Sequence, residues 1–210
     1  DHTYLSGANA SMPVHFLSIA EKCVQDFNPA AKFVVDIGSN AGTLLRQFKK
    51  VGLKVLGVEP CSEASKVAIE SGIPTKNDFF DRSQADDIRN EFGHADIVSA
   101  ANVFYHVEKL HDIVAGVTSL LAERGTFIIQ GTYLPELIEN NEFDIIYHEH
   151  LLYYRVGNLN FLLRKHGLEI FDVQFADVHG GSFIAYACHE GSRTVLDSVA
   201  ESLANERSLG

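Results

Sequence analysis

The chain of 210 residues has no tryptophan, one methionine and only three cysteines. Cys23, Cys61 and Cys188 lie far apart and form no C-x-x-C pair, which disfavours a zinc ribbon or a framework of disulfides. No apolar run approaches the roughly 18 residues that a membrane span needs. We therefore expect a soluble, cytoplasmic protein that has no membrane partner.

Positive charge is also scarce. The chain has 17 lysines and arginines against 28 aspartates and glutamates, which gives a formal net charge of −11. No basic cluster is available to contact a phosphate backbone, so we expect a small-molecule partner and no nucleic acid. The sequence starts at Asp1 without a charged-then-apolar leader, and the last helical pattern has no clear cap. We expect the chain to be a piece of a longer protein.

Short β-branched runs alternate with helical patterns, and no repeat or linker divides the chain. Strands are predicted over residues 33–38, 54–59, 96–100, 125–130, 168–175 and 182–188. Helical spacing of apolar residues is found from Ser11 to Phe27 and over residues 43–50, 62–70, 106–123, 159–166 and 194–207. Alternation of this kind predicts an α/β fold with a mostly parallel sheet, and the closing pair of strands predicts a mixed edge.

A glycine loop follows the first predicted strand, where ligands of open parallel sheets bind. Its glycines, Gly38 and Gly42, allow a tight turn, and the next helix offers free N–H groups. The dinucleotide fingerprint G-x-G-x-x-G requires glycines where this chain has Asn40 and Thr43, so NAD is disfavoured. Glu59 ends the second strand, where a carboxylate accepts hydrogen bonds from both hydroxyls of a ribose. We predict a nucleoside-bearing cofactor held by Asp36, Gly38, Ser39, Asn40, Gly42 and Glu59.

Four consecutive residues, Tyr147-His148-Glu149-His150, combine a phenol, two imidazoles and a carboxylate. Histidine titrates near neutrality, and a neighbouring carboxylate or phenol orients it or stabilises developing charge, so the pattern indicates proton abstraction. Two alternatives stay open at this point. His148 and His150 would share a face of a strand and bind a metal with His106 or His179, or these histidines have only structural contacts. We expect no metal.

The glycine loop resembles the first motif of class I S-adenosylmethionine (SAM) dependent methyltransferases. The resemblance implies SAM as cofactor and a Rossmann-like fold with a mostly parallel seven-stranded sheet and helices on both faces. It also implies that Glu59 contacts the ribose. By the same resemblance, residues after the third strand surround the adenine and residues after the fourth strand face the methionine part; these are Asn77, Asp78 and Phe79, and Ala101 and Asn102.

A narrower resemblance rests on five short strings in order along the chain. They are Tyr4-Leu5-Ser6, Gly38-Ser39-Asn40, Asn102-Val103-Phe104-Tyr105-His106, Tyr147-His148-Glu149-His150 and His179-Gly180-Gly181-Ser182. The set looks like the sugar C-methyltransferases that act on nucleotide-linked 4-keto-deoxysugars. Members of that family usually carry a zinc-binding domain before this region and another α/β domain after it, and this chain has neither. It also departs at Ala41, where the family commonly has aspartate.

Methylation of carbon needs a carbon nucleophile, which a base generates from the C–H bond beside a ketone. The resemblance and this chemistry together imply that His150 is the general base, with Tyr147 and His106 as enolate stabilisers or alternative proton carriers and Glu149 as the orienting group. On the substrate side, the resemblance implies contacts to the nucleotide sugar from Tyr4, His179, Gly180 and Ser182.

We therefore expect one methyltransferase domain over residues 1–210. Within it, residues 1–30 are a helical segment, 31–132 the cofactor-binding core, and 133–210 the catalytic and substrate side with the C-terminal strands. Two other functions stay open. In the first, the acceptor atom is an oxygen or nitrogen of another small molecule, and His150 deprotonates it. In the second, the chain is a non-catalytic SAM-binding module that requires flanking domains.

Overall fold

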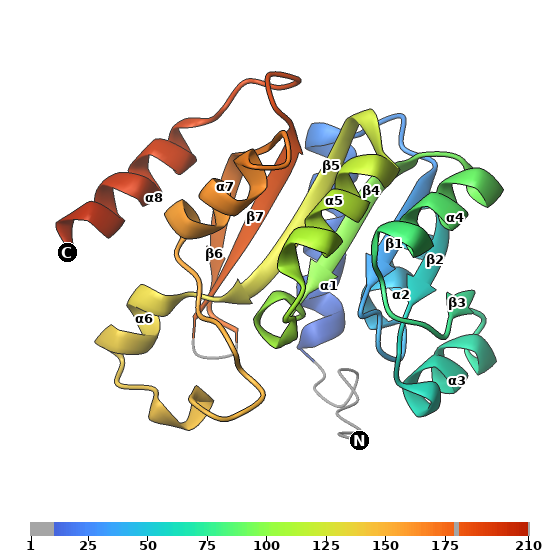
Figure 1. Ribbon diagram of the computed structural model, residues 1–210, viewed down its shortest axis with the longest axis horizontal. Coiled ribbons are helices and arrows are strands. Elements are labelled where there is room, and N and C mark those ends of the chain that lie inside the picture. The colour runs from blue at the N-terminus through green and yellow to red at the C-terminus, as the bar shows by residue number, and fades with distance from the viewer. Residues whose placement is uncertain (1–10, 179–180, 210) are drawn as a thin grey trace.

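The computed structural model describes residues 11–178 and 181–209 (Figure 1). Its strands are β1 Phe33–Ile37, β2 Lys54–Val58, β3 Thr75–Lys76, β4 Ala95–Ala101, β5 Leu121–Thr132, β6 Leu168–Ala176 and β7 Ser182–His189. They form one seven-stranded sheet in the order β3-β2-β1-β4-β5-β7-β6. Strands β1 to β5 pair in parallel, whereas β7 runs antiparallel to both β5 and β6. The predicted mostly parallel sheet with a mixed edge is confirmed.

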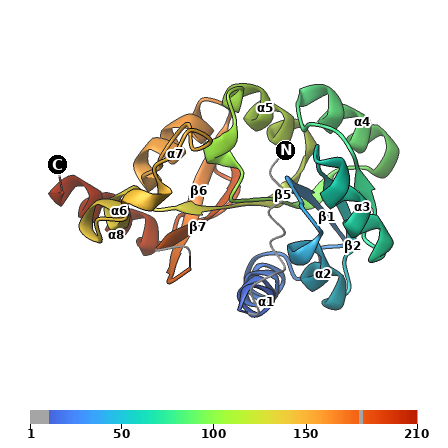
Figure 2. The same ribbon diagram turned by 90° about the horizontal axis from the view of Figure 1, so that it is seen from below.

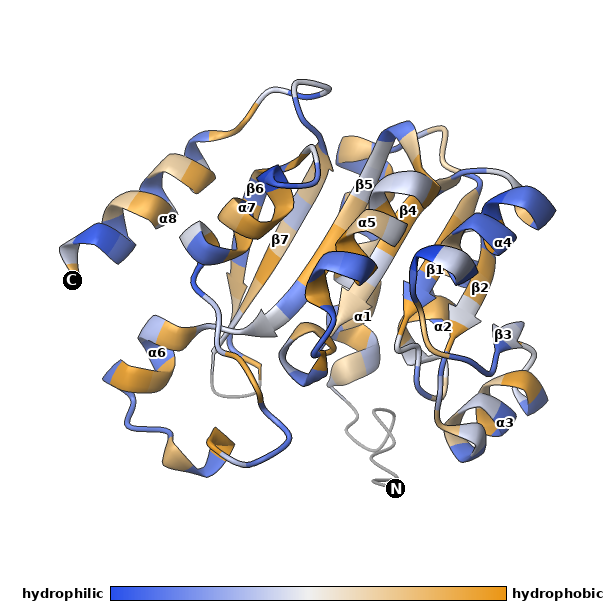
Figure 3. Ribbon diagram, in the orientation of Figure 1, coloured by the Kyte–Doolittle hydropathy of each residue, from blue (hydrophilic) through white to orange (hydrophobic). Residues whose placement is uncertain are grey.

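Helices cover both faces of this sheet (Figure 2). They are α1 Met12–Lys22, α2 Thr43–Lys50, α3 Ser62–Glu70, α4 Arg82–Phe92, α5 Leu110–Leu120, α6 Leu134–Glu139, α7 Val156–Arg164 and α8 Asp197–Ser208. Apolar side chains of α4, α5 and α7 pack on one face, and those of α1 and α2 pack on the other. Because both faces are covered, β1 is buried along its whole length, and Figure 3 shows the strands as mainly apolar.

The sequence predicted α2 and α3 with the bounds that the structure gives them. It missed α4, because this helix turns only Ala85 and Ile88 into the core and therefore has little apolar periodicity. It also missed the short α6. The helix predicted over residues 106–123 was too long, since His106 lies in a 3-10 turn, Phe104–His106, before α5 begins.

The winding of the sheet reverses at β1, which pairs with β2 on one side and with β4 on the other. At this point the loops that follow β1 and β4 lie next to each other. Open α/β sheets bind ligands at such a switch point, outside the carboxyl ends of the strands. Within the described residues, no helix has the length and apolar character to cross a membrane.

Candidate functional site

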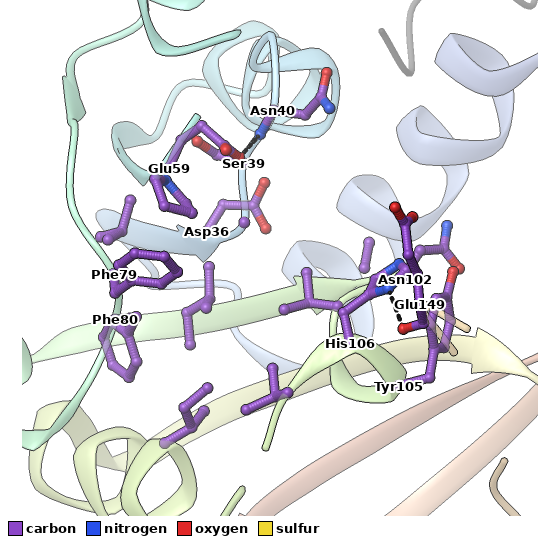
Figure 4. Close-up of a pocket in the computed structure, with 18 of the residues that line it drawn as sticks. Asp36, Ser39, Asn40, Glu59, Phe79, Phe80, Asn102, Tyr105, His106 and Glu149 are labelled. Carbon is purple, nitrogen blue, oxygen red and sulfur yellow. Dashed lines mark hydrogen bonds between the residues drawn. The ribbon is translucent and has the colours of Figure 1, made fainter. Parts of the chain in front are cut away.

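A cavity of about 1240 Å³ opens at the carboxyl ends of β1, β2 and β4 (Figure 4). The loops after β1 and β2 form one wall, and the loop after β4, which contains the 3-10 turn Phe104–His106, forms the other together with residues 144–150. Met12 and Phe16 of α1 also line it. Most of the residues predicted to bind a cofactor or to act as catalysts lie along this cavity: Asp36, Gly38, Ser39, Asn40, Glu59, Phe79, Ala101, Asn102, His106, Tyr147, Glu149 and His150.

Gly38 brings the backbone of the glycine loop close to the neighbouring β4 loop. Its φ is +64°, and a Cβ at this position would lie 2.5 Å from Cγ2 of Val103. Both the left-handed backbone and the lack of space require glycine here. Gly42 was also predicted to contact the cofactor, but it does not line the cavity: it adopts φ +77° before α2 and packs against Ile73. Its role is to start the helix.

Glu59 is held in place by the backbone at the end of β2. Its Oε2 accepts a hydrogen bond of 2.8 Å from the N–H of Asn40, and its Oε1 accepts one of 2.8 Å from the N–H of Cys61. Each carboxylate oxygen has a second lone pair, so two further donors can bind. The side chain is therefore a fixed acceptor for a pair of hydroxyl groups.

Asp36 lies at the end of β1 and is almost fully buried. The hydroxyl of Ser99 donates a hydrogen bond of 2.6 Å to its Oδ1. Burial raises the pKa of Asp36 to about 7, and the charge of Glu59 adds to this effect, while the bond from Ser99 opposes it. Near neutral pH the carboxyl group is thus poised between its two states, and a cation beside it would favour the ionised form.

The loop after β3 places Phe79 on the cavity with 73% of its surface exposed. Asn77 and Asp78, predicted to contact the cofactor beside it, do not line the cavity. The amide of Asn77 instead donates to the carbonyl oxygen of Glu59 at 2.8 Å, and Asp78 accepts from the N–H of Phe79 at 2.8 Å. Their side chains are used to shape the loop that presents Phe79.

The opposite wall gathers three rings around His150. Its ring centroid lies 4.2 Å from that of Tyr147, 4.3 Å from that of Tyr105 and 5.0 Å from that of His106. Burial and, secondly, the charge of His106 lower the pKa of His150, although a hydrogen bond to the backbone of Ile145 and the charge of Glu149 oppose this shift. A lowered pKa keeps the imidazole neutral at pH 7, which a general base requires.

The backbone of residues 147–150, here called the histidine motif, holds the imidazole of His106 in place. Nδ1 of His106 lies 2.9 Å from the carbonyl oxygen of Glu149, as Figure 4 shows. A carbonyl oxygen only accepts, so Nδ1 carries the hydrogen, and Nε2 is the unprotonated nitrogen of the neutral ring. Glu149 was predicted to orient a histidine, and its backbone oxygen holds His106 in this way. Burial, and then Glu149, raise the pKa of Tyr147, which keeps this phenol a hydrogen-bond donor.

Ser182 was predicted to border the substrate, but it is fully buried at the start of β7. Its hydroxyl donates a hydrogen bond of 2.9 Å to the carbonyl oxygen of Val178. Tyr4, His179 and Gly180 lie outside the described residues. Across the part of the chain that the structure describes, no three histidines, cysteines or acidic residues are arranged to hold a metal ion.

Sequence reasoning missed cavity residues from several places. Phe80 and Asp81 follow Phe79 directly, and proximity to that predicted contact was a usable signal. The start of α5 and helix α1 carried no such signal, because they reach the cavity only through tertiary packing. The missed residues include Met12, Phe16, Phe80, Asp81, Tyr105, Lys109, Asp112 and Asp144.

Known structures share this fold at low sequence identity. The magnesium protoporphyrin IX methyltransferase of Synechocystis PCC 6803, solved with bound S-adenosylhomocysteine (SAH), superposes with a TM-score of 0.65 and 16% identity, covering 85% of this chain and 84% of that one. A methyltransferase of calicheamicin biosynthesis, CalO1, gives a TM-score of 0.62 and 18% identity over 85% of this chain and 54% of its own. The expected class I methyltransferase fold is confirmed.

Similarity at the sequence level is more specific. The C-methyltransferase NovU of Streptomyces niveus is 36% identical over 211 residues, which cover 100% of this chain. The chain spans about half the length of that relative, since 50% of it is covered. Residues 13–173 match the family described as methyltransferase domain. This match extends over most of the chain, and the chain therefore belongs to the methyltransferase domain family.

Proposed function

We propose that the chain is a SAM-dependent methyltransferase that methylates carbon in a nucleotide-linked 4-keto-deoxysugar by way of an enolate. The observation that carries the proposal is His150, an imidazole with a lowered pKa that lines the same cavity as Glu59. The 36% identity to a relative named as a C-methyltransferase supports carbon as the acceptor atom. The assignment of a sugar as the substrate rests on the resemblance of the sequence motifs.

The residues along the cavity fit SAM. Glu59 offers acceptors for the ribose hydroxyls, Asp36 offers a carboxyl group for a cation, and Phe79 offers an exposed ring for the adenine. The buried hydroxyl of Ser39 has no hydrogen-bond partner within the described part of the protein, although it lines the cavity. A bound polar group would satisfy it. SAM supplies a methyl group made electrophilic by the positively charged sulfur.

The proton is handled by the ring cluster. His150 takes the proton from the carbon beside the ketone, and the O–H of Tyr147 or the imidazole of His106 stabilises the enolate oxygen. The electron pair of the enolate would then form the new carbon–carbon bond to the methyl group, while the bond from that methyl group to the sulfonium sulfur breaks and leaves its electron pair on the sulfur of the demethylated product. On the same proposal, residues 1–210 act as one methyltransferase domain, and Tyr4, His179 and Gly180 border the sugar.

The decisive comparison is His150→Ala against His148→Ala. His148 belongs to the same motif but is exposed and does not line the cavity, so it is a matched control. SAM affinity is measured by calorimetry, and deuterium uptake beside the ketone of a 4-keto nucleotide sugar is measured by NMR in heavy water. We expect His150→Ala to slow uptake by about 10²- to 10⁴-fold at unchanged SAM affinity, while His148→Ala behaves like the wild type.

Each departure from this pattern has its own meaning. Full uptake by His150→Ala refutes His150 as the base. A wild-type chain that binds SAM but shows no uptake favours an oxygen or nitrogen acceptor or a binding module. If the wild type does not bind SAM, the whole proposal is wrong.

A further inference from the structure

The 3-10 turn Phe104–His106 is tied to the histidine motif on both sides of His150. The carbonyl oxygen of Glu149 lies 2.9 Å from Nδ1 of His106, and the N–H of Leu151 donates to the carbonyl oxygen of Tyr105 at 2.8 Å. These bonds reach the residues immediately before and immediately after His150. The position of this imidazole is therefore set by the turn as well as by its own segment.

Tyr105 is the member of the turn whose ring contacts both imidazoles. Its centroid lies 4.3 Å from that of His150, with the planes tilted by 56°, and 4.5 Å from that of His106, with the planes at 61°. The two imidazoles are 5.0 Å apart. Tyr105 also lines the cavity and packs against the apolar core. A single side chain thus contacts both imidazoles.

We propose that Tyr105 is a positioning residue, whose aromatic ring holds His150 and His106 in their relative orientation and excludes water from them. The proposal rests on the proposed function, because it assigns the proton transfer to these imidazoles. Tyr105 does not exchange a proton in this scheme; it acts through the histidines. The contacts that carry the argument are made by the ring, so the ring is what the reaction requires.

This role has an electrostatic consequence. Burial is the largest cause of the lowered pKa of His150, followed by the charge of His106. Removing the Tyr105 ring would expose the imidazole to water and favour its charged form. Glu149 and the backbone of Ile145 already favour that form, so a smaller contribution from burial would shift the balance toward it. The pKa of His150 should rise, and less of the imidazole should be in the basic form near neutral pH.

The test compares Tyr105→Phe, which keeps the ring, with Tyr105→Leu and Tyr105→Met, which keep apolar volume without it. Three quantities are measured on the whole chain: the pKa of His150 by NMR of labelled histidines, SAM affinity by calorimetry, and the pH profile of deuterium uptake beside the ketone. For Tyr105→Phe we expect a His150 pKa within about half a unit of the wild type, and comparable uptake. For the Leu and Met variants we expect a higher pKa, an acid limb moved to higher pH, and uptake slowed at least about tenfold near pH 7 at unchanged SAM affinity.

The outcomes separate this proposal from its alternatives. If Tyr105→Phe loses uptake to the same extent as Tyr105→Leu, the hydroxyl group is what matters and the proposal is refuted. The proposal is equally refuted if Tyr105→Leu or Tyr105→Met leaves the His150 pKa unchanged. It is also refuted if SAM affinity and uptake fall in parallel in both of these variants, as we would expect if Tyr105 were purely structural. If the wild type shows no uptake, the proposed function fails, while the comparison of pKa values still decides whether Tyr105 controls His150. Should the Leu variant not fold, the Met variant decides.

Discussion

Replacing Gly38 with alanine should damage both the fold and the cavity, by an amount that the geometry sets. The backbone at Gly38 has φ +64°, which costs an alanine about 1–2 kcal/mol. Its Cβ would also meet Cγ2 of Val103 at 2.5 Å, and relieving an overpacked contact costs about 1–3 kcal/mol more. We therefore expect Gly38→Ala to lower the free energy of unfolding by about 2–5 kcal/mol.

The chain contains a matched control in Gly167. This glycine has a similar φ of +74°, but a Cβ there would have no heavy atom within 4 Å. Gly167→Ala should therefore cost only the backbone term of about 1–2 kcal/mol. In the double variant Gly38→Ala/Val103→Ala the colliding methyl groups are absent, so the additional cost of Gly38→Ala should largely disappear. Urea denaturation measures the free energy of unfolding of the wild type and of these three variants.

The same variants test the cavity. Gly38 lines it, so a shift of the loop away from Val103 should weaken SAM binding by at least about tenfold, or 1.4 kcal/mol, whereas Gly167→Ala should bind SAM like the wild type. The reasoning is refuted if the two alanine variants lose the same stability, or if removing the Val103 methyl groups restores nothing.

Three further predictions concern titrating and buried polar groups. Glu206 accepts hydrogen bonds from the backbone N–H groups at the start of α7, so Glu206→Ala should lower the free energy of unfolding by about 2–4 kcal/mol. The control Glu201→Ala, at an exposed residue, should lower it by less than about 0.5 kcal/mol, and equal losses would contradict this prediction. Nδ1 of His111 lies 2.8 Å from Nε2 of His166, and burial followed by the charge of His111 lowers the pKa of His166. The folded state then binds fewer protons than the unfolded chain, so stability should fall as the pH drops below about 6.5, and His166→Gln, followed by urea denaturation against pH, should flatten that slope. Burial raises the pKa of Asp36 to about 7, so SAM, a cation, should bind more tightly as the pH rises through 7 and should release protons when it binds. Calorimetry in two buffers would detect this proton release, and Asp36→Asn should abolish it.

The sequence predicted best what is fixed by local spacing. Helix α2 has a glycine before it and apolar residues at helical spacing, so its bounds could be read directly. Helix α4 buries only two apolar residues and was missed, although Asp81, whose side chain accepts from the N–H of Gln84 at 2.8 Å, was a usable start signal. The parallel sheet followed from alternation alone, because few other arrangements bury strands that are apolar on both faces.

The site divides in the same way. Residues directly after strand ends, such as Asp36 and Glu59, were predicted because a parallel sheet brings all its carboxyl ends to one edge. Tyr105 could not be predicted as a neighbour of His150, since two irregular segments far apart in the chain make this contact and no periodicity marks it. The resemblance to SAM-dependent methyltransferases implied that Asn77 contacts the cofactor, but its amide donates to the Glu59 carbonyl oxygen and so lies in the loop.

The charges along the cavity bear on which ligands it binds under the proposed function. Within the described residues, Lys109 is the one lysine or arginine that lines it, against seven acidic residues: Asp36, Glu59, Asp81, Glu108, Asp112, Asp144 and Glu149. SAM carries one more positive charge than its demethylated product. Loss of the sulfonium charge in the reaction therefore weakens the hold on the product and promotes its exchange for a new SAM. The same charges repel anions, so on the proposed function we expect the uncharged ketone end of the nucleotide sugar, rather than its phosphates, to enter this cavity.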